Sequence, residues 1–209
     1  MGNETLPEEL SQALYHGKEE AYLEYKGNFS WRDNPKKFEI VQTILAMANK
    51  REGGIIVIGV EDAGGRIGLS EENYNSYSHD QINQYLEGKC NQSISCKVSN
   101  IEHQEEGVPD SKKFVFIQVK ETREFPLVYT GGLCVFNSDV PGYGPNVALR
   151  RSAIYVRNTS SVGNKEIETV EEWQELIERT YGKYEKETLR RAETVGGSDS
   201  NPFDEELNI

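Results

Sequence analysis

The stretch GGIIVIGV, residues 53–60, is the most apolar run of the chain. It contains four β-branched residues in succession, from Ile55 to Ile58. Side chains of this kind on both the odd and the even positions favour a strand that is buried on both faces. The next residues, EDAGG at 61–65, are typical of a turn, and residues 66–69 are expected to return as the second strand of a hairpin. The run therefore predicts the central strand of a sheet.

Helices and shorter strands are predicted on either side of this strand. A helix is expected over residues 5–17, where Thr5 can cap the first turn and Pro7 suits it. Further helices are expected over residues 35–49, 78–88 and 169–181. Shorter strands are expected over residues 22–26, 94–101, 113–119, 127–130 and 153–157, and a long loop over 131–151. This order predicts an α+β fold, with a mixed or antiparallel sheet and helices packed on it.

Composition limits the classes of function. The chain has 209 residues and a formal net charge of -12, which disfavours a uniformly basic nucleic-acid surface but leaves room for a local basic groove. The length fits one domain, expected over residues 1–185, followed by an acidic, disordered tail over 186–209. No apolar window is long enough to span a membrane, and the N-terminus lacks the pattern of a signal peptide. Three cysteines cannot all pair, so reduced thiols and a cytoplasmic location are expected.

A group of acids and one lysine is the strongest candidate for a chemical site. Glu24 and Lys26 are two apart on an expected strand and so share a face. Glu19 can join them only if the chain bends after Gly17, and Asp62 follows the apolar run. Three carboxylates that converge would bind Mg²⁺ or Mn²⁺, and a lysine beside them would stabilise charge on a phosphate. Each residue taken singly is also common on a solvated strand face or in a turn, so convergence is the expectation on which the site depends.

Basic residues suggest where a phosphate backbone would lie. Arg32, Lys36 and Lys37 flank the helix expected from residue 35, and Arg157 ends an expected strand. We expect these four residues to bind nucleic acid, with an aromatic side chain such as Trp31 available to stack on a base. The alternative is that they are solvated surface charges in a chain rich in charged residues.

Four segments together resemble a known family. They are EEAYLEYK at 19–26, ILAMAN at 44–49, GGIIVIGVED at 53–62 and IYVRNTSS at 154–161. Their order and content resemble the AlbA-like domain of the Schlafen family, over about residues 10–181. The resemblance implies an AlbA-like α+β fold and a single lobe of the kind that animal members pair in one chain, so a homodimer is expected here.

The resemblance also implies roles for the acidic group. In Schlafen endoribonucleases the matching acids form the catalytic, metal-binding set, which implies Glu19, Glu24 and Asp62 as ligands of Mg²⁺ or Mn²⁺ and Lys26 as a contact to the scissile phosphate. RNA, including transfer RNA, or DNA is the implied partner. Tyr25 stands where the family has phenylalanine, and the loop before the apolar run is one residue longer.

Other cofactors are not expected. The cysteine and histidine set of the animal members has no counterpart, and Cys90, Cys96 and His103 match no common zinc spacing. The glycines around the apolar run fit neither a P-loop nor a dinucleotide fingerprint, so no ATP or nicotinamide site is expected.

Three hypotheses of function therefore stand. The first is a divalent-metal-dependent endoribonuclease that acts on structured RNA such as transfer RNA. The second is a non-catalytic DNA- or RNA-binding regulatory module. The third is an interaction subunit of a larger complex, with a protein partner bound through the acidic tail.

Overall fold

The computed structural model describes residues 6–105, 107, 109–122, 126–136, 146–158, 163–178 and 181–182. The chain divides into two compact units, residues 1–168 and residues 169–209. The predicted division at residue 185 and the predicted acidic tail lie outside the described residues. None of the helices in this described part of the chain has the length and apolar character that crossing a bilayer requires.

The second unit contains a helix over residues 170–178. Its start is a reciprocal cap, because the Thr169 hydroxyl accepts a hydrogen bond from the Glu172 amide at 3.3 Å and the Glu172 carboxylate accepts one from the Thr169 amide at 3.2 Å. Such a pair satisfies two backbone donors that a helix start leaves open. The predicted beginning of this helix at residue 169 is confirmed.

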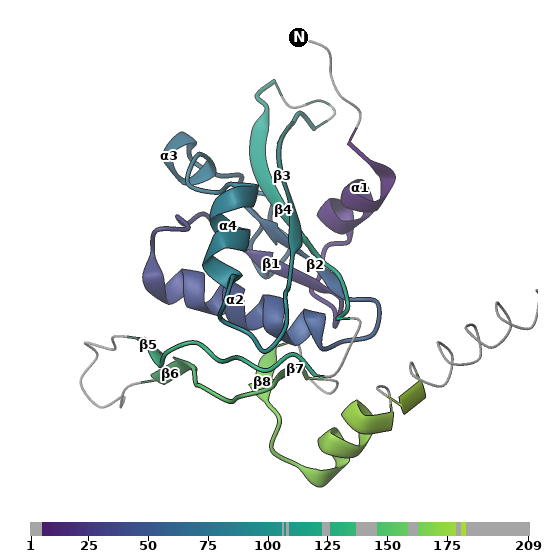
Figure 1. The fold of residues 1–209 in the computed structure, drawn as a ribbon. Coiled ribbons are helices and arrows are strands. Elements are labelled where there is room, and N and C mark those ends of the chain that lie inside the picture. Colours follow the sequence, from purple (N-terminus) through teal and green to yellow (C-terminus); the bar gives the residue numbers. More distant parts are fainter. Residues whose placement is uncertain are drawn as a thin grey trace, which may run out of the picture. The chain divides into compact units, whose positions relative to one another are not determined.

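The first unit is an α+β fold, as predicted (Figure 1). Its helices are α1 (Glu8–Tyr15), α2 (Asn34–Ala48), α3 (Glu71–Tyr74) and α4 (His79–Leu86). Its strands are β1 (Leu23–Lys26), β2 (Gly54–Ile58), β3 (Cys96–His103), β4 (Lys112–Val119), β5 (Cys134–Phe136), β6 (Asn146–Leu149), β7 (Tyr155–Arg157) and β8 (Asn164–Glu166). The main sheet has the order β1-β2-β4-β3, in which β1 and β2 are parallel and the other pairs are antiparallel.

The apolar strand β2 lies inside this sheet and is buried on both faces, as its sequence predicts. Ile55 and Val57 belong to a hydrophobic cluster with α1, while Ile56 and Ile58 belong to a second cluster with α2 and α4. Strand β4 alternates in the same way, so the two clusters form on opposite faces of one sheet. Burying apolar surface on both faces is the main source of stability for this arrangement.

Two predictions beside β2 are wrong. Residues 66–69 do not form a return strand, because β1 and β4 take both edges of β2 and only an isolated bridge joins Val60 to Arg66. Residues 127–130 do not form a strand either, since only Tyr129 pairs, in an isolated bridge with Cys90. The turn itself is as predicted, and the Glu61 amide donates to the Gly65 carbonyl at 2.9 Å to close it.

The predicted loop over 131–151 is wrong in part, because it contains the hairpin β5–β6. A second hairpin, β7–β8, follows, and α2 contacts all four of these strands. Figure 1 shows α2 between the main sheet and the two hairpins. Local sequence gave no sign of β8, since its three residues are neither apolar nor β-branched.

A buried amide fastens the end of α2 to the second half of the unit. The Asn49 side chain donates to the carbonyls of Leu127 at 2.9 Å and Tyr155 at 3.0 Å, and it accepts from the Leu127 amide at 2.7 Å. A buried amide satisfied in this way fixes the position of the backbone around it. The contact brings β7, and with it Arg157, to the side of the sheet where β1 lies.

Replacing Gly53 with alanine should severely destabilise the first unit. Gly53 has φ +71°, and a Cβ there would lie 2.0 Å from the Val119 carbonyl oxygen. We expect Gly53→Ala to lower the free energy of unfolding by about 3 kcal/mol or more. Urea unfolding followed by circular dichroism measures the change. Gly27→Ala is the matched control, because a Cβ at Gly27 meets nothing within 4 Å, and equal midpoints for the two variants would contradict this backbone placement.

Candidate functional site

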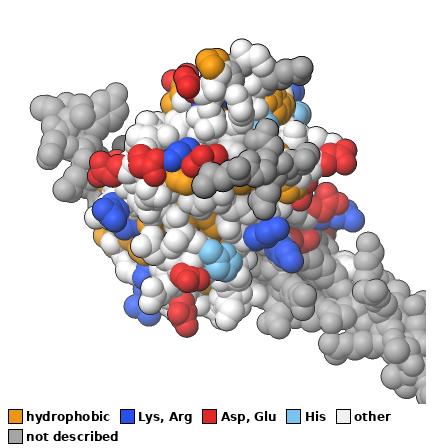
Figure 2. All heavy atoms as spheres, turned by 90° about the horizontal axis from the view of Figure 1, so that it is seen from above, with side chains coloured by type: hydrophobic (Ala, Val, Ile, Leu, Met, Phe, Trp, Pro, Cys, Tyr) orange, Lys and Arg blue, Asp and Glu red, His pale blue; other side chains and the backbone are white. Residues whose placement is uncertain are grey.

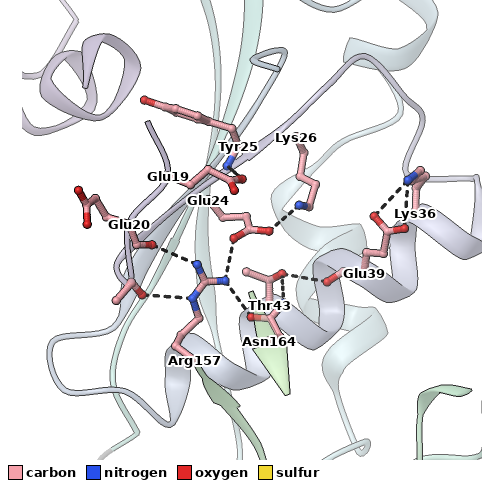
Figure 3. A network of polar contacts seen from close by, with 11 residues as sticks. Glu19, Glu20, Glu24, Tyr25, Lys26, Lys36, Glu39, Thr43, Arg157 and Asn164 are labelled. Carbon is pink, nitrogen blue, oxygen red and sulfur yellow. Dashed lines mark hydrogen bonds and ion pairs between the residues drawn. The ribbon is translucent and has the colours of Figure 1, made fainter. Parts of the chain in front are cut away.

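The centre of the candidate site is a carboxylate held between two cations (Figure 3). Glu24 lies on β1 and is only 5% exposed. One of its oxygens lies 2.5 Å from the Lys26 ammonium, and the other lies 2.7 Å from the Arg157 guanidinium. The Glu24–Lys26 pair confirms that these two side chains share a face of the strand.

Arg157 is a structural cation in this arrangement. Its side chain is 2% exposed, and besides Glu24 it donates to the Asn164 side chain at 2.8 Å and to the carbonyls of Glu20 and Ala21 at 3.1 and 3.2 Å. A buried guanidinium is tolerated when its donors are satisfied in this way. The contact of Arg157 with a phosphate backbone stays a prediction, and in this structure the guanidinium is buried and donates to groups of the protein.

Asn164 extends the network to α2. Its amide donates to the Thr43 hydroxyl at 2.7 Å, and that hydroxyl donates to the Glu39 carbonyl at 3.0 Å. Sequence reasoning missed Asn164, which stands in β8 and belongs to no motif. Only the pairing of β8 with β7 brings it beside Arg157.

The bend that the site requires is present after α1. Gly17 has φ +85°, a conformation that glycine adopts without strain. The Tyr25 hydroxyl secures the bend, since it donates to the Ala13 carbonyl at 2.8 Å and accepts from the Gly17 amide at 3.2 Å. Glu19 is thereby turned onto β1, where its carboxylate accepts from the Tyr25 amide at 2.9 Å.

The charges around Glu19 indicate that the acids share one neighbourhood. Burial raises the pKa of Glu19, and the carboxylates of Glu24 and Asp62 raise it further, while the Tyr25 amide and the Lys26 ammonium lower it. Glu19 is therefore protonated at a higher pH than an ordinary glutamate.

Asp62 is exposed and lies in the turn after β2. That turn packs on the bend after α1, because a Cβ at Gly64 would come within 2.5 Å of the Gly17 carbonyl oxygen. The contact between these two backbone segments places Asp62 near Glu19.

As arranged, the three carboxylates do not fit a shared metal ion. No group of three or more His, Cys, Asp or Glu side chains within the described ranges could hold one. Both oxygens of Glu24 are in ion pairs, and Glu19 accepts from a backbone amide. The site for Mg²⁺ or Mn²⁺ stays a prediction.

The basic residues expected to bind nucleic acid separate into two groups. Lys36 pairs with Glu39 at 3.0 Å, on the side of α2 that Figure 3 shows. Arg32 and Lys37 instead line one hollow together with Tyr85, which the sequence had not singled out.

Cys96 and His103, two members of the weak zinc candidate set, lie far apart. Cys96 and His103 are the two ends of β3, which places them about 23 Å apart at 3.3 Å per residue. His103 instead hydrogen-bonds the Tyr15 hydroxyl at 2.7 Å. Burial raises the pKa of Cys90 to about 11 and of Cys96 to about 12, so both stay protonated thiols at neutral pH.

Comparison with known proteins identifies a family. A family model described as Schlafen, AlbA_2 matches residues 19–164, which is more than half of the chain. The match begins at Glu19 and ends at Asn164, so it spans the whole network around Glu24. A search of curated protein sequences found no match.

Among solved structures, the crystal structure of the DIP2311 protein from Corynebacterium diphtheriae is similar at 15% identity and a TM-score of 0.43. The similarity covers 78% of this chain and 27% of that chain. This chain thus spans about a quarter of the length of that protein.

Removing the Arg157 charge should destabilise the protein, because it leaves Glu24 buried with one partner fewer. We expect Arg157→Met to lower the free energy of unfolding by about 3–5 kcal/mol. Urea unfolding measures it, with the exposed Arg151→Met as the matched control. The result that contradicts the structural role is an Arg157→Met midpoint equal to that of Arg151→Met.

The raised pKa of Glu19 predicts a pH dependence of stability. The folded protein holds the Glu19 proton to a higher pH than the unfolded chain does, so this group favours folding at low pH and the advantage is lost as the pH rises above about 4.3. Glu19→Gln keeps an acceptor for the Tyr25 amide but has no ionisable group at this position, so this variant does not lose that stability as the pH rises. We therefore expect the melting temperature of Glu19→Gln, relative to wild type, to increase between about pH 4 and pH 7.

The matched control for this prediction is Glu72→Gln on α3, which removes one exposed acidic charge. It corrects for the general relief of repulsion in a protein with a net charge of -12. If the melting temperatures of the two variants, each relative to wild type, change with pH in the same way over this range, the pKa of Glu19 is not raised.

Proposed function

Because the chain belongs to the Schlafen AlbA_2 family, we propose that it is directed at nucleic acids and that its acidic cluster acts on the phosphodiester backbone of RNA. The acidic cluster comprises Glu19, Glu24, Asp62 and Lys26. The observation that carries the proposal is the placement of Glu24, Lys26 and Glu19 together at β1, where Glu24 pairs with Lys26 and Glu19 accepts from the Tyr25 amide, in a segment that the family model matches. The finer proposal is an endoribonuclease that acts on structured RNA such as transfer RNA.

The residues of the cluster offer two of the functions that RNA cleavage needs. Glu19 holds its proton to a higher pH than usual, which suits a group that transfers a proton to or from a ribose hydroxyl or a leaving oxygen. Lys26 is 17% exposed, and its ammonium can stabilise negative charge that develops on the phosphate. Glu24 orients Lys26 through their ion pair.

A divalent metal belongs to the finer proposal. Mg²⁺ or Mn²⁺ would neutralise the phosphate if Glu19, Glu24 and Asp62 held it. Glu24 would then share its charge between the metal and the two cations that it already pairs with. The roles given to Glu19 and Lys26 do not depend on it.

A non-catalytic nucleic-acid-binding module is the second candidate. It is favoured by the ion pairs that both Glu24 oxygens form with Lys26 and Arg157, because these two cations already compensate the charge that a metal ion would otherwise neutralise. Figure 2 shows basic side chains scattered among acidic ones on the described part of one face, so binding would depend on a local group of cations rather than on a broad basic surface.

Cleavage and binding assays on the same preparation separate the two candidates. Labelled transfer RNA, single-stranded RNA, and single- and double-stranded DNA are incubated with the protein in Mg²⁺, in Mn²⁺ and in EDTA. We expect RNA cleavage that falls about 100-fold or more in Glu19→Gln and in Lys26→Met, with binding retained. Glu72→Gln and Lys120→Gln change the same charges at exposed positions and serve as controls.

Each result of these assays has a distinct meaning. Cleavage that persists in EDTA would indicate that the residues of the cluster cleave RNA without a metal ion. Cleavage only with Mg²⁺ or Mn²⁺ would indicate that a metal ion at the cluster is required. Binding without cleavage in all conditions leaves the non-catalytic module. A protein that neither binds nor cleaves any of these nucleic acids refutes the proposal as a whole.

A further inference from the structure

A hollow of about 440 Å³ lies between the start of α2, with the residues just before it, and α4, with the residues just after it. It is lined by Trp31, Arg32, Lys37, Gln81, Gln84, Tyr85 and Lys89. Three of these side chains are cations and none is an acid. In a protein with a net charge of -12, a hollow of this composition is unexpected.

The cations of this hollow differ from others in the first unit. Within the described ranges, Arg32, Lys37 and Lys89 form no salt bridge. In contrast, Arg66 is paired with Glu105 at 2.9 Å. The positive charge of the hollow is therefore not neutralised by a neighbouring carboxylate.

Three acids lie near these residues in the sequence but are not among those that line the hollow. Asp33 precedes α2, and its charge acts on Tyr77, which does not line the hollow. Asp80 and Glu87 line an adjoining hollow, which shares Gln84 with the basic one. Neither they nor Asp33 is among the residues that line the basic hollow.

Two aromatic rings form the floor of the hollow. Trp31 is 6% exposed and meets Tyr85 edge-on, with 5.8 Å between ring centroids and 86° between planes. The ammonium groups of Lys37 and Lys89 lie 5.1 and 4.6 Å from the Tyr85 centroid. Burial and the neighbouring Cys134 raise the pKa of Tyr85 to about 12, so its hydroxyl stays neutral and adds no negative charge.

We propose that this hollow binds a single-stranded segment of nucleic acid, with its phosphates at Arg32, Lys37 and Lys89 and one base against Tyr85. The inference rests on the proposed function and adds to it a binding site apart from the acidic cluster. Cations around an aromatic ring are the combination that single strands need, because the backbone is anionic and each base has a face that stacks.

A duplex does not fit the hollow in the same way, because its bases are already stacked on one another and offer only their edges. An incoming base replaces one ammonium on Tyr85, and that ammonium then meets the adjacent phosphate. Gln81 and Gln84 are exposed on the same side of α4 and supply amide donors and acceptors for the edge of the base.

Fluorescence anisotropy with a labelled 12-nucleotide single-stranded RNA, in EDTA, tests the charges. We expect Lys37→Gln/Lys89→Gln to weaken binding about tenfold, and to reduce the slope of log affinity against log salt by about 1.4, which corresponds to two phosphates on a single strand. The matched control is Lys97→Gln/Lys120→Gln, which removes two exposed lysines that line a different hollow. This control should bind within about twofold of wild type.

The aromatic contact is tested separately. Tyr85→Leu should weaken binding about fivefold or more, and Tyr85→Phe, which keeps the ring, should bind as wild type does. Trp31 gives a direct signal, because it is the remaining tryptophan in a Trp173→Phe background. Single-stranded RNA should quench its fluorescence with the same affinity that anisotropy reports.

The outcomes distinguish this inference from the proposed function. If wild type binds none of the probes, the proposed function fails. If wild type binds but the Lys37/Lys89 variant matches its control, the function stands and the hollow is not the site. Equal affinity for a 12-base-pair RNA duplex would overturn the preference for a single strand.

Discussion

The ion pair between Glu24 and Arg157 is the interaction on which the first unit depends. A carboxylate that is 5% exposed would be very costly to bury without a partner, and this one meets a guanidinium at 2.7 Å. The two residues are far apart in the chain, on β1 and β7, so the pair fixes the later hairpin against the first strand. Because every contact of the guanidinium has a defined direction, the pair also specifies how β7 and β8 lie on α2.

Side chains of helix α2 take part in two separate groups of contacts. Thr43 on α2 joins the Glu24 network through Asn164, and Lys36 at the start of the helix pairs with Glu39 beside it. The next residue, Lys37, turns instead toward Tyr85 and the basic hollow. Helix α2 thus contributes Thr43 to the network around Arg157 and Lys37 to the basic hollow.

The chemical character of the cluster follows from the balance of its charges. The negative charge of Glu24 is compensated by Lys26 and Arg157. Glu19 is instead partly buried and lies near the carboxylates of Glu24 and Asp62, and both effects raise its pKa. A metal ion would reverse this balance, because it would favour the ionised form of every carboxylate near it. In this structure the buried cation beside Glu24 is Arg157. The sequence had led us to predict that this residue contacts the phosphate backbone.

The sequence by itself determined the central strand, its burial on both faces, the principal helices and the α+β class, because hydrophobic periodicity and helix-start residues are local signals. It also determined that Glu24 and Lys26 share a face, and that a bend after Gly17 would be needed to bring Glu19 to them. Only the tertiary structure decided the partners of β2, the pairing of β8, the burial of Arg157 and the meeting of Lys37 with Tyr85. Each of these depends on which segments pack side by side, and no local propensity encodes a contact between residues so distant in the chain.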